Sequence, residues 1–352
     1  MLHIKYLYKY TLVTGLLILI AVAAYYLKSK DTEGTWLNRN SHKVNSLTSN
    51  NYDDLEFLKE VLKDKQYVFL GESSHGVAEY STAKVRLIKY LHENLGFDVV
   101  AFESHMGDAA IASTELTTNK FGNTYGIMKK ALYLTPWNNK QTAPLFDYIL
   151  NKKETNSLSF IGFDMQTSST FSNFMSKWIE SYNQEDSHKF TQLESSWADM
   201  YSNLSNLEKK LTEEDVQKYE NDYNKFIVFV DEHANDLGAN YPQEKNMKQL
   251  IIKSLQNRID FIKRAYRSNY TEDDKFSIRD VIMEENIIWL SNAIYPNKKI
   301  IFWAHNGHIR DNNTEIFAKD YGQSDFQQWQ SKSMFENLPN EYKKKSYILG
   351  FY

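Results

Sequence analysis

Five short apolar runs constrain the fold of this 352-residue chain more than any other feature. Apolar side chains follow one another in these runs instead of alternating with polar ones. Such runs are typical of strands that are buried on both faces, as in a largely parallel sheet covered by helices. We therefore predict an α/β fold with a mostly parallel central sheet flanked by helices. The runs lie at 67–70, 98–103, 158–164, 299–305 and 347–352.

A long helical segment interrupts the predicted strands. Between about residues 168 and 296 the chain is rich in Lys, Glu, Asn and Tyr, and its apolar residues recur at helical spacing. We predict a helical insertion there, within one folded domain that spans 51–352. Its Trp178 and Trp197 are expected to pack in the core, because aromatic residues at helical spacing usually do so.

The N-terminus predicts a location. Residues 11–27 are apolar and uncharged and follow Lys5 and Lys9. This stretch just reaches the roughly 17 residues that a short membrane span requires. Residues 1–28 are therefore predicted to be a membrane anchor or an export signal, and Ala21-Val22-Ala23 would suit a signal peptidase. A polar linker at 29–50 follows, so we expect the folded domain outside the cytoplasm, tied to the membrane through 11–27 or exported.

Composition excludes several classes of protein. The formal net charge is −4 and both signs are interspersed, which is unlike the basic surface of a nucleic-acid binder. The chain has no Cys, so thiol nucleophiles, disulfides and thiolate metal sites are excluded. Only His, Asp and Glu remain as strong metal ligands.

Ionisable residues stand where the predicted strands end. In open α/β sheets ligands bind at the carboxyl ends of parallel strands, which meet at one edge. A shared polar pocket at this edge is therefore expected. Its members would be Glu72 and His75 after the first run, Glu103 at the end of the second with His105 beside it, Asp164 at the end of the third, and His305 and His308 after the fourth.

These motifs resemble the erythromycin esterase family. The family pattern Gly-Glu-x-x-His-Gly is matched by residues 71–76. The resemblance implies an esterase that opens the lactone ring of a macrolide with water, without metal or other cofactor, on a small-molecule ester substrate. Further similar segments occur in the family's order at 100–103, 162–166, 277–286 and 303–308.

The resemblance also implies roles for single residues. His75 is expected to be the general base, since a neutral imidazole can take a proton from water near neutral pH. Glu72 and Glu103 would orient the His75 ring and the water, although Glu72 could instead cap the following helix. His305 and His308 are expected to hold the ester carbonyl or stabilise the oxyanion.

Four further residues are predicted to bind substrate or the oxyanion. Lys84 occupies the position nine after His75 where the family leads us to expect Arg, and Arg86 follows two residues later. Lys offers a point charge where Arg offers a planar fork. Asp164 and Arg279 complete this set, with Asp280 next to Arg279 as its expected partner in the pocket wall.

Serine catalysis is not favoured. The candidate serines at 73, 74 and 104 lie outside any Gly-x-Ser-x-Gly elbow, which is the motif that exposes the nucleophile of α/β-hydrolases. We therefore predict direct attack by water. The segment 121–150, which includes Trp137, is aromatic enough to line an apolar cleft, and packing explains it equally well.

Two other functions stay open. A metallohydrolase would use His75, His305, Glu72 and Glu103 as ligands, although the chain lacks a His-Glu-x-x-His run. A membrane-tethered binding module would keep the fold and lack turnover, through Lys84 or the short C-terminus. Of the three, the metal-free esterase is favoured.

Overall fold

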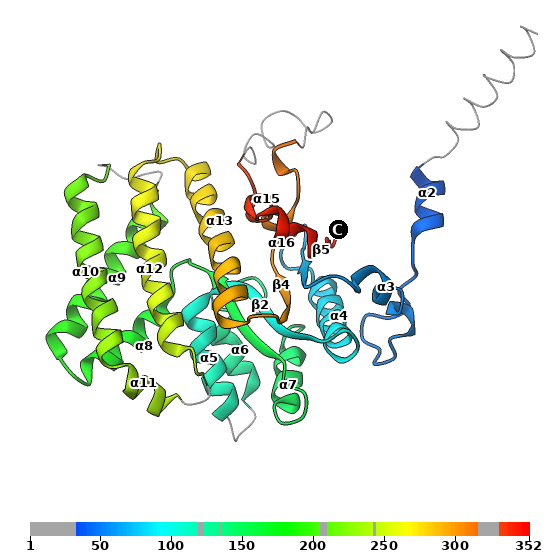
Figure 1. Ribbon diagram of the computed structural model, residues 1–352, viewed down its shortest axis with the longest axis horizontal. Coiled ribbons are helices and arrows are strands. Elements are labelled where there is room, and N and C mark those ends of the chain that lie inside the picture. The colour runs from blue at the N-terminus through cyan, green and yellow to red at the C-terminus, as the bar shows by residue number, and fades with distance from the viewer. Residues whose placement is uncertain (1–32, 119–122, 134, 205–209, 242–243, 316–330) are drawn as a thin grey trace, which may run out of the picture. The chain divides into compact units, whose positions relative to one another are not determined.

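The computed structural model describes residues 33–118, 123–133, 135–204, 210–241, 244–315 and 331–352 (Figure 1). The predicted membrane segment at 11–27 lies outside these residues, so it stays a prediction. Within the described ranges no helix is both long and apolar enough to cross a bilayer.

The chain divides into two compact units. The smaller comprises residues 1–46 and 53–57, and its described part holds α2 (Glu33–Asn40) and the short η1 (Asp53–Leu55). The rings of His42 and Phe57 stack there with centroids 4.0 Å apart. The larger unit, residues 47–52 and 58–352, contains the sheet and the predicted site residues.

A five-stranded sheet forms the centre of the larger unit. Every pair of neighbouring strands is parallel, which confirms the predicted parallel α/β sheet. The apolar runs of β1 to β4 are buried on both faces, whereas β5 at the edge of the sheet is only partly buried. Phe69 of β1 pairs with Phe302 of β4. The strands are β1 (Tyr67–Leu70), β2 (Phe97–His105), β3 (Ser159–Asp164), β4 (Lys299–Trp303) and β5 (Ser346–Leu349), in the spatial order β3-β2-β4-β1-β5.

Helices connect and cover the strands. α4 (Ala78–Leu95) ends at Gly96, whose φ of +70° suits glycine at a helix terminus. The other helices outside the β3 to β4 connection are α3 (Leu58–Leu62), α5 (Met106–Thr118), α6 (Thr124–Ala131), α7 (Ala143–Lys152), α14 (Asn306–Ile309), η4 (Asn313–Glu315), α15 (Met334–Asn337) and α16 (Asn340–Lys344).

The connection from β3 to β4 is helical. In Figure 1 its helices, coloured green to yellow, stand beside the sheet, and α13 returns the chain to β4. α10 and α13 each begin with a capping box, at Thr212 and Thr271. Trp178 and Trp197 are buried among these helices. They are α8 (Ser169–Glu180), α9 (Gln184–Ser202), α10 (Glu213–Glu232), α11 (Ala234–Asn240), α12 (Met247–Tyr266), α13 (Glu272–Trp289) and the π-helical η3 (Leu290–Ile294).

Candidate active site

The site lies at the carboxyl edge of the parallel sheet. The loop after β1 carries Glu72 and His75, β2 carries Glu103, β3 ends on Asp164, and His305 follows β4. Parallel strands end at the same edge, so these side chains approach one another although they are far apart in sequence. Three helices supply the rest: Lys84 comes from α4, Arg279 and Asp280 from α13, and His308 from α14.

Close backbone packing joins the loops after β1 and β4. A Cβ on Gly71 would lie only 1.8 Å from the Asn306 side-chain oxygen, so no other residue fits there without movement. The Asn306 backbone N–H donates to the Glu72 carbonyl oxygen at 2.9 Å. The motif glycine at 71 therefore brings the Glu72 loop against α14.

Glu72 links His75 to Lys84. Its Oε1 lies 2.9 Å from His75 Nδ1, and its Oε2 accepts a hydrogen bond from Lys84 Nζ at 2.8 Å. Burial would raise the pKa of Glu72, but Lys84 outweighs burial and lowers it, so the carboxylate is ionised at neutral pH. Burial in turn lowers the pKa of Lys84 to about 8.

The carboxylate assigns the tautomer of His75. Ionised Glu72 can only accept, so Nδ1 of His75 carries the proton and Nε2 keeps its lone pair. The His75 side chain is 52% exposed, whereas that of Glu72 is 4% exposed. Trp137 lies edge-on to the His75 ring at a centroid distance of 6.1 Å. His75 is thus a half-exposed imidazole whose orientation is fixed by the buried Glu72–Lys84 ion pair.

His305 faces His75 with the opposite tautomer. The two ring centroids are 4.8 Å apart. His305 Nδ1 accepts a hydrogen bond from the Gly307 backbone N–H at 3.0 Å, so neutral His305 carries its proton on Nε2. Burial lowers the pKa of His305, with Glu103 opposing and His75 reinforcing that effect, so the ring is neutral at pH 7. The two neighbouring rings therefore carry a lone pair on His75 Nε2 and an N–H donor on His305 Nε2.

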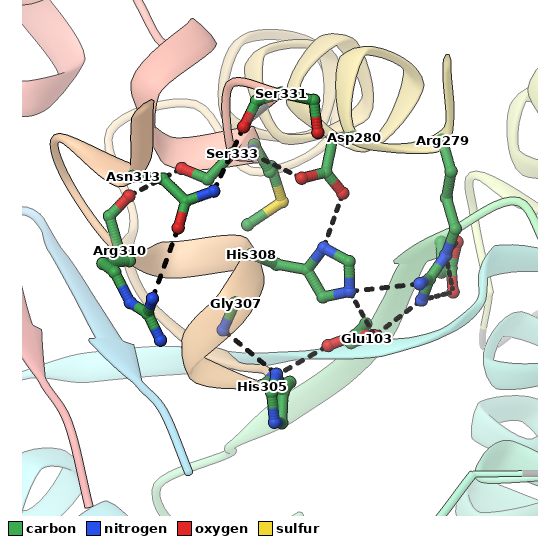
Figure 2. Close-up of polar contacts among 12 residues, drawn as sticks. Glu103, Arg279, Asp280, His305, Gly307, His308, Arg310, Asn313, Ser331 and Ser333 are labelled. Atoms are coloured by element: carbon green, nitrogen blue, oxygen red, sulfur yellow. Dashed lines mark hydrogen bonds and ion pairs between the residues drawn. The ribbon is translucent and has the colours of Figure 1, made fainter. Parts of the chain in front are cut away.

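Glu103 supports the His305 backbone and bonds Arg279 (Figure 2). Its Oε2 accepts from the His305 backbone N–H at 2.9 Å. Its Oε1 accepts from Arg279 Nη2 at 2.6 Å and lies 3.3 Å from His308 Nε2. Of the two predicted carboxylate partners of His75, the structure therefore brings only Glu72 to the ring.

Arg279 joins Glu103 to Asp164. Its Nη2 donates to Asp164 Oδ2 at 2.7 Å, and its Nε lies 3.1 Å from Oδ1. Burial would raise the pKa of Asp164, but Arg279 outweighs burial and lowers it. All three side chains are buried. A planar guanidinium suits this position because it can serve two carboxylates at once.

His308 lies behind Glu103 and is tied to Asp280. Its Nδ1 lies 2.5 Å from Asp280 Oδ1, and Asp280 Oδ2 accepts from the Met334 backbone N–H at 3.0 Å. Burial would lower the pKa of His308, but Asp280 and Glu103 outweigh it and raise the pKa. Arg279 and Asp280, which were expected to pair directly, instead contact opposite nitrogens of the His308 ring, with Arg279 Nη1 3.1 Å from Nε2, as Figure 2 shows.

Arg86 is not brought to this cluster. Its Nε and Nη2 donate to the backbone oxygens of Ser49 and Asn51 at 2.9 and 2.6 Å. Residues two apart on a helix point in different directions, so Lys84 and Arg86 of α4 cannot both face the site.

The candidate serines have other contacts. Ser73 Oγ lies 3.4 Å from the Tyr80 hydroxyl, and Ser74 Oγ donates to the His75 carbonyl oxygen. Ser104 is buried.

The sequence predicted Asp280 only as a residue of the pocket wall. Its position next to Arg279 was the one signal that could have pointed to its contact with His308.

Residues 92–352 match the pattern of the erythromycin esterase family. The chain belongs to this family. The match covers β2 to the C-terminal residues, and with them Glu103, Asp164 and both histidines after β4.

Relatives of this family member include YbfO of Bacillus subtilis (strain 168), which is named provisionally as a hydrolase. The two are 33% identical over 332 residues, which is 90% of this chain and 71% of YbfO. Erythromycin esterase type II of Escherichia coli is 28% identical over 115 residues, 33% of this chain and 27% of that protein.

Solved structures share the fold of this family member. A His-to-Asn mutant of erythromycin esterase EreC in its open conformation superposes with a TM-score of 0.58 at 17% identity, over 85% of this chain and 73% of that one. A Bacillus cereus protein gives a TM-score of 0.60 at 20% identity, over 90% and 73%.

The acidic residues of the site do not fit a metal ion well. Lys84 already neutralises Glu72, and Arg279 already bonds both Glu103 and Asp164. Across the described part of the chain, no group of three or more His, Asp or Glu residues has the arrangement that holds a metal ion.

Proposed function

We propose that this protein hydrolyses a carboxylic ester or lactone, with His75 as the base that activates water. The observation that carries the proposal is the pair of facing imidazoles with opposite tautomers. His75 presents a lone pair and His305 presents an N–H donor, 4.8 Å apart between ring centroids. Hydrolysis of an ester needs a base for the water and a donor for the carbonyl oxygen.

The reaction proceeds in two steps. His75 Nε2 takes a proton from water as the water oxygen attacks the ester carbonyl carbon, and Glu72 stabilises the imidazolium that forms. His305 Nε2–H donates to the oxyanion of the tetrahedral intermediate. When the intermediate collapses, the ester C–O bond breaks and His75 returns the proton to the leaving alkoxide oxygen. The products are a carboxylate, after loss of its proton to solvent, and an alcohol.

A macrolide is the substrate class that we propose first. Support comes from the family and from the relative named erythromycin esterase type II, which matches part of this chain. Opening a lactone gives one product, whose mass exceeds that of the substrate by one water. This makes a macrolide panel easy to read by mass spectrometry.

The test is an assay of purified protein against macrolides and simple esters, with H75N and H188N compared with the wild type. His188 is exposed on α9 of the helical segment and takes no part in the contacts of the site described above. It therefore serves as a matched control. Removing the general base should lower kcat/KM by about 10²–10⁴-fold. H188N should keep the wild-type rate.

Three results would contradict the proposal. Loss of activity on treatment with a chelator, restored by added metal, would favour the metallohydrolase. A wild-type protein that turns over no ester in the panel would favour the binding module. Wild-type rates in H75N would remove His75 from the mechanism.

We also propose that the domain works outside the cytoplasm, held by the apolar segment 11–27. Support comes from the sequence: the segment is uncharged and the chain has no Cys. Cell fractionation with protease added to intact cells tests this. A domain that resists protease until the cells are lysed would contradict it.

A further inference from the structure

A second buried cluster of polar side chains lies beside the site and takes no part in the proposed reaction. Its centre is Arg258 of α12, which is completely buried. A buried guanidinium is costly unless charge and hydrogen bonds compensate it. The partners of Arg258 therefore indicate what this residue does.

One side of Arg258 bonds the ends of two strands. Nη1 donates to the Met165 carbonyl oxygen at 2.6 Å, directly after β3. Nη2 lies 3.0 Å from Nε2 of His105, the last residue of β2. Because a guanidinium only donates, this His105 nitrogen is the acceptor. One side chain thus spans the carboxyl ends of β2 and β3.

The other side of Arg258 contacts the helical segment through an ion pair and an aromatic ring. Its Nε lies 3.5 Å from Glu194 Oε1, and its guanidinium lies 3.8 Å from the Trp197 ring centroid. Glu194 in turn accepts hydrogen bonds from Tyr223 of α10 at 2.8 Å and from Ser172 of α8 at 2.7 Å. The charge of Arg258 is therefore compensated from α9, and the contacts extend to two more helices.

Short contacts lead from these strand ends to the site. The Met165 backbone N–H donates to Asp164 Oδ1 at 2.7 Å, and Asp164 holds Arg279. His105 lies two residues after Glu103 on β2, where the register between β2 and β3 shifts. A displacement of either strand end would move Asp164 or Glu103 relative to Arg279.

We propose that Arg258 is a positioning residue, which fixes the ends of β2 and β3 and thereby the Glu103–Arg279–Asp164 arrangement that supports His305. The helical segment between β3 and β4 would then be part of the catalytic framework. The kinetic consequence rests on the proposed function, whereas the consequence for the histidine rings does not.

R258K is the main test variant. Lys keeps the charge beside Glu194, so the fold should survive. Its single ammonium lacks the planar fork of Arg, so it cannot hold both Met165 and His105 in the same geometry. The matched control is R264K, on the same helix, where Arg264 pairs with Glu285 at 2.6 Å and both side chains are more than a third exposed.

Kinetics give the first readout. A misplacement of about 1 Å in a catalytic site can cost about 10²-fold in rate, so R258K should lower kcat by about 10 to 100-fold while KM changes little. R264K should keep the wild-type kcat. Equal kcat in R258K and wild type would overturn the proposal.

Nitrogen NMR of the histidine rings gives the second readout and needs no substrate. The chain has nine His, and single His substitutions assign the ring signals. R258K should shift the signals of His105 and also those of His305 and His308. A shift confined to His105 would show a local packing role and would overturn the proposal, even if the protein proved to have no esterase activity.

Discussion

Removing Lys84 tests the electrostatic basis of the site most directly. In K84M the buried Glu72 carboxylate loses the Lys84 ammonium that lies 2.8 Å from it. Breaking a buried ion pair by deleting one partner costs about 3–5 kcal/mol, since the remaining charge is uncompensated. Glu72 can escape part of this cost by taking a proton, at about 1.4 kcal/mol for each unit that its pKa must rise. We expect a loss of about 3 kcal/mol in the free energy of unfolding at pH 7.

Activity should fall more steeply than stability. Protonated Glu72 no longer holds the proton on His75 Nδ1, and no longer stabilises the imidazolium. A drop in kcat/KM of about 10²-fold or more is expected, measured on folded protein, because general-base catalysis contributes about 10²–10⁴-fold.

Two variants control this experiment. The double variant E72Q/K84M removes both charges, and residues in direct contact couple by about 0.5–3 kcal/mol, so it should be more stable than K84M alone. K130M removes an exposed pair with Glu115 at 2.7 Å and should cost under about 1 kcal/mol. Urea unfolding of all three gives the comparison. A K84M protein with the wild-type midpoint and a kcat/KM within about threefold of wild type would refute the reasoning.

Three further predictions concern pH and charge. Since the pKa of Lys84 is about 8, activity should fall as the pH rises through that value, and K84R should lose this alkaline limb because a guanidinium stays protonated. The raised pKa of His308 means that its charged pair with Asp280 stabilises the fold below pH 6.5 and stops doing so as the pH rises through the raised pKa. D280N should therefore destabilise by about 3 kcal/mol at pH 6 and by less at pH 9, as read from urea unfolding. Burial, with Glu285 nearby, raises the pKa of Glu284 to about 7, so E284Q should stabilise the protein by about 1–2 kcal/mol at pH 8 and not at pH 4, in thermal unfolding at both pH values.

The sheet could be predicted because its signal is local. Continuous apolar runs indicate strands buried on both faces, and polar residues at their ends indicate one shared edge. The closeness of His75 and His305 follows from that topology, although 230 residues separate them along the chain.

Partner choice within the site could not be predicted in the same way. Whether Lys84 or Arg86 reaches Glu72 depends on the rotation of α4, and Glu103 prefers Arg279 to His75 because α13 carries a long side chain over the edge of β2 and β3. These are tertiary effects, and single-sequence periodicity does not contain them. The Arg258 contacts are similar, since α12 shows only an apolar stripe in the sequence.

The charges of the site favour the base that we propose at His75. Among the described residues that hold the two imidazoles, four carboxylates face two cations: Glu72 pairs with Lys84, Glu103 and Asp164 share Arg279, and Asp280 bonds His308, whose other ring nitrogen lies 3.1 Å from Arg279 Nη1. This leaves an excess of negative charge in a largely buried framework. An imidazolium that forms on His75 beside Glu72 therefore gains stabilisation, whereas an oxyanion would be repelled unless a donor lay between it and Glu103. His305 occupies that position, with its backbone N–H on Glu103 and its ring beside His75. The excess charge thus favours the proposed proton transfer, and the proposed His305 donor would offset its repulsion of the oxyanion.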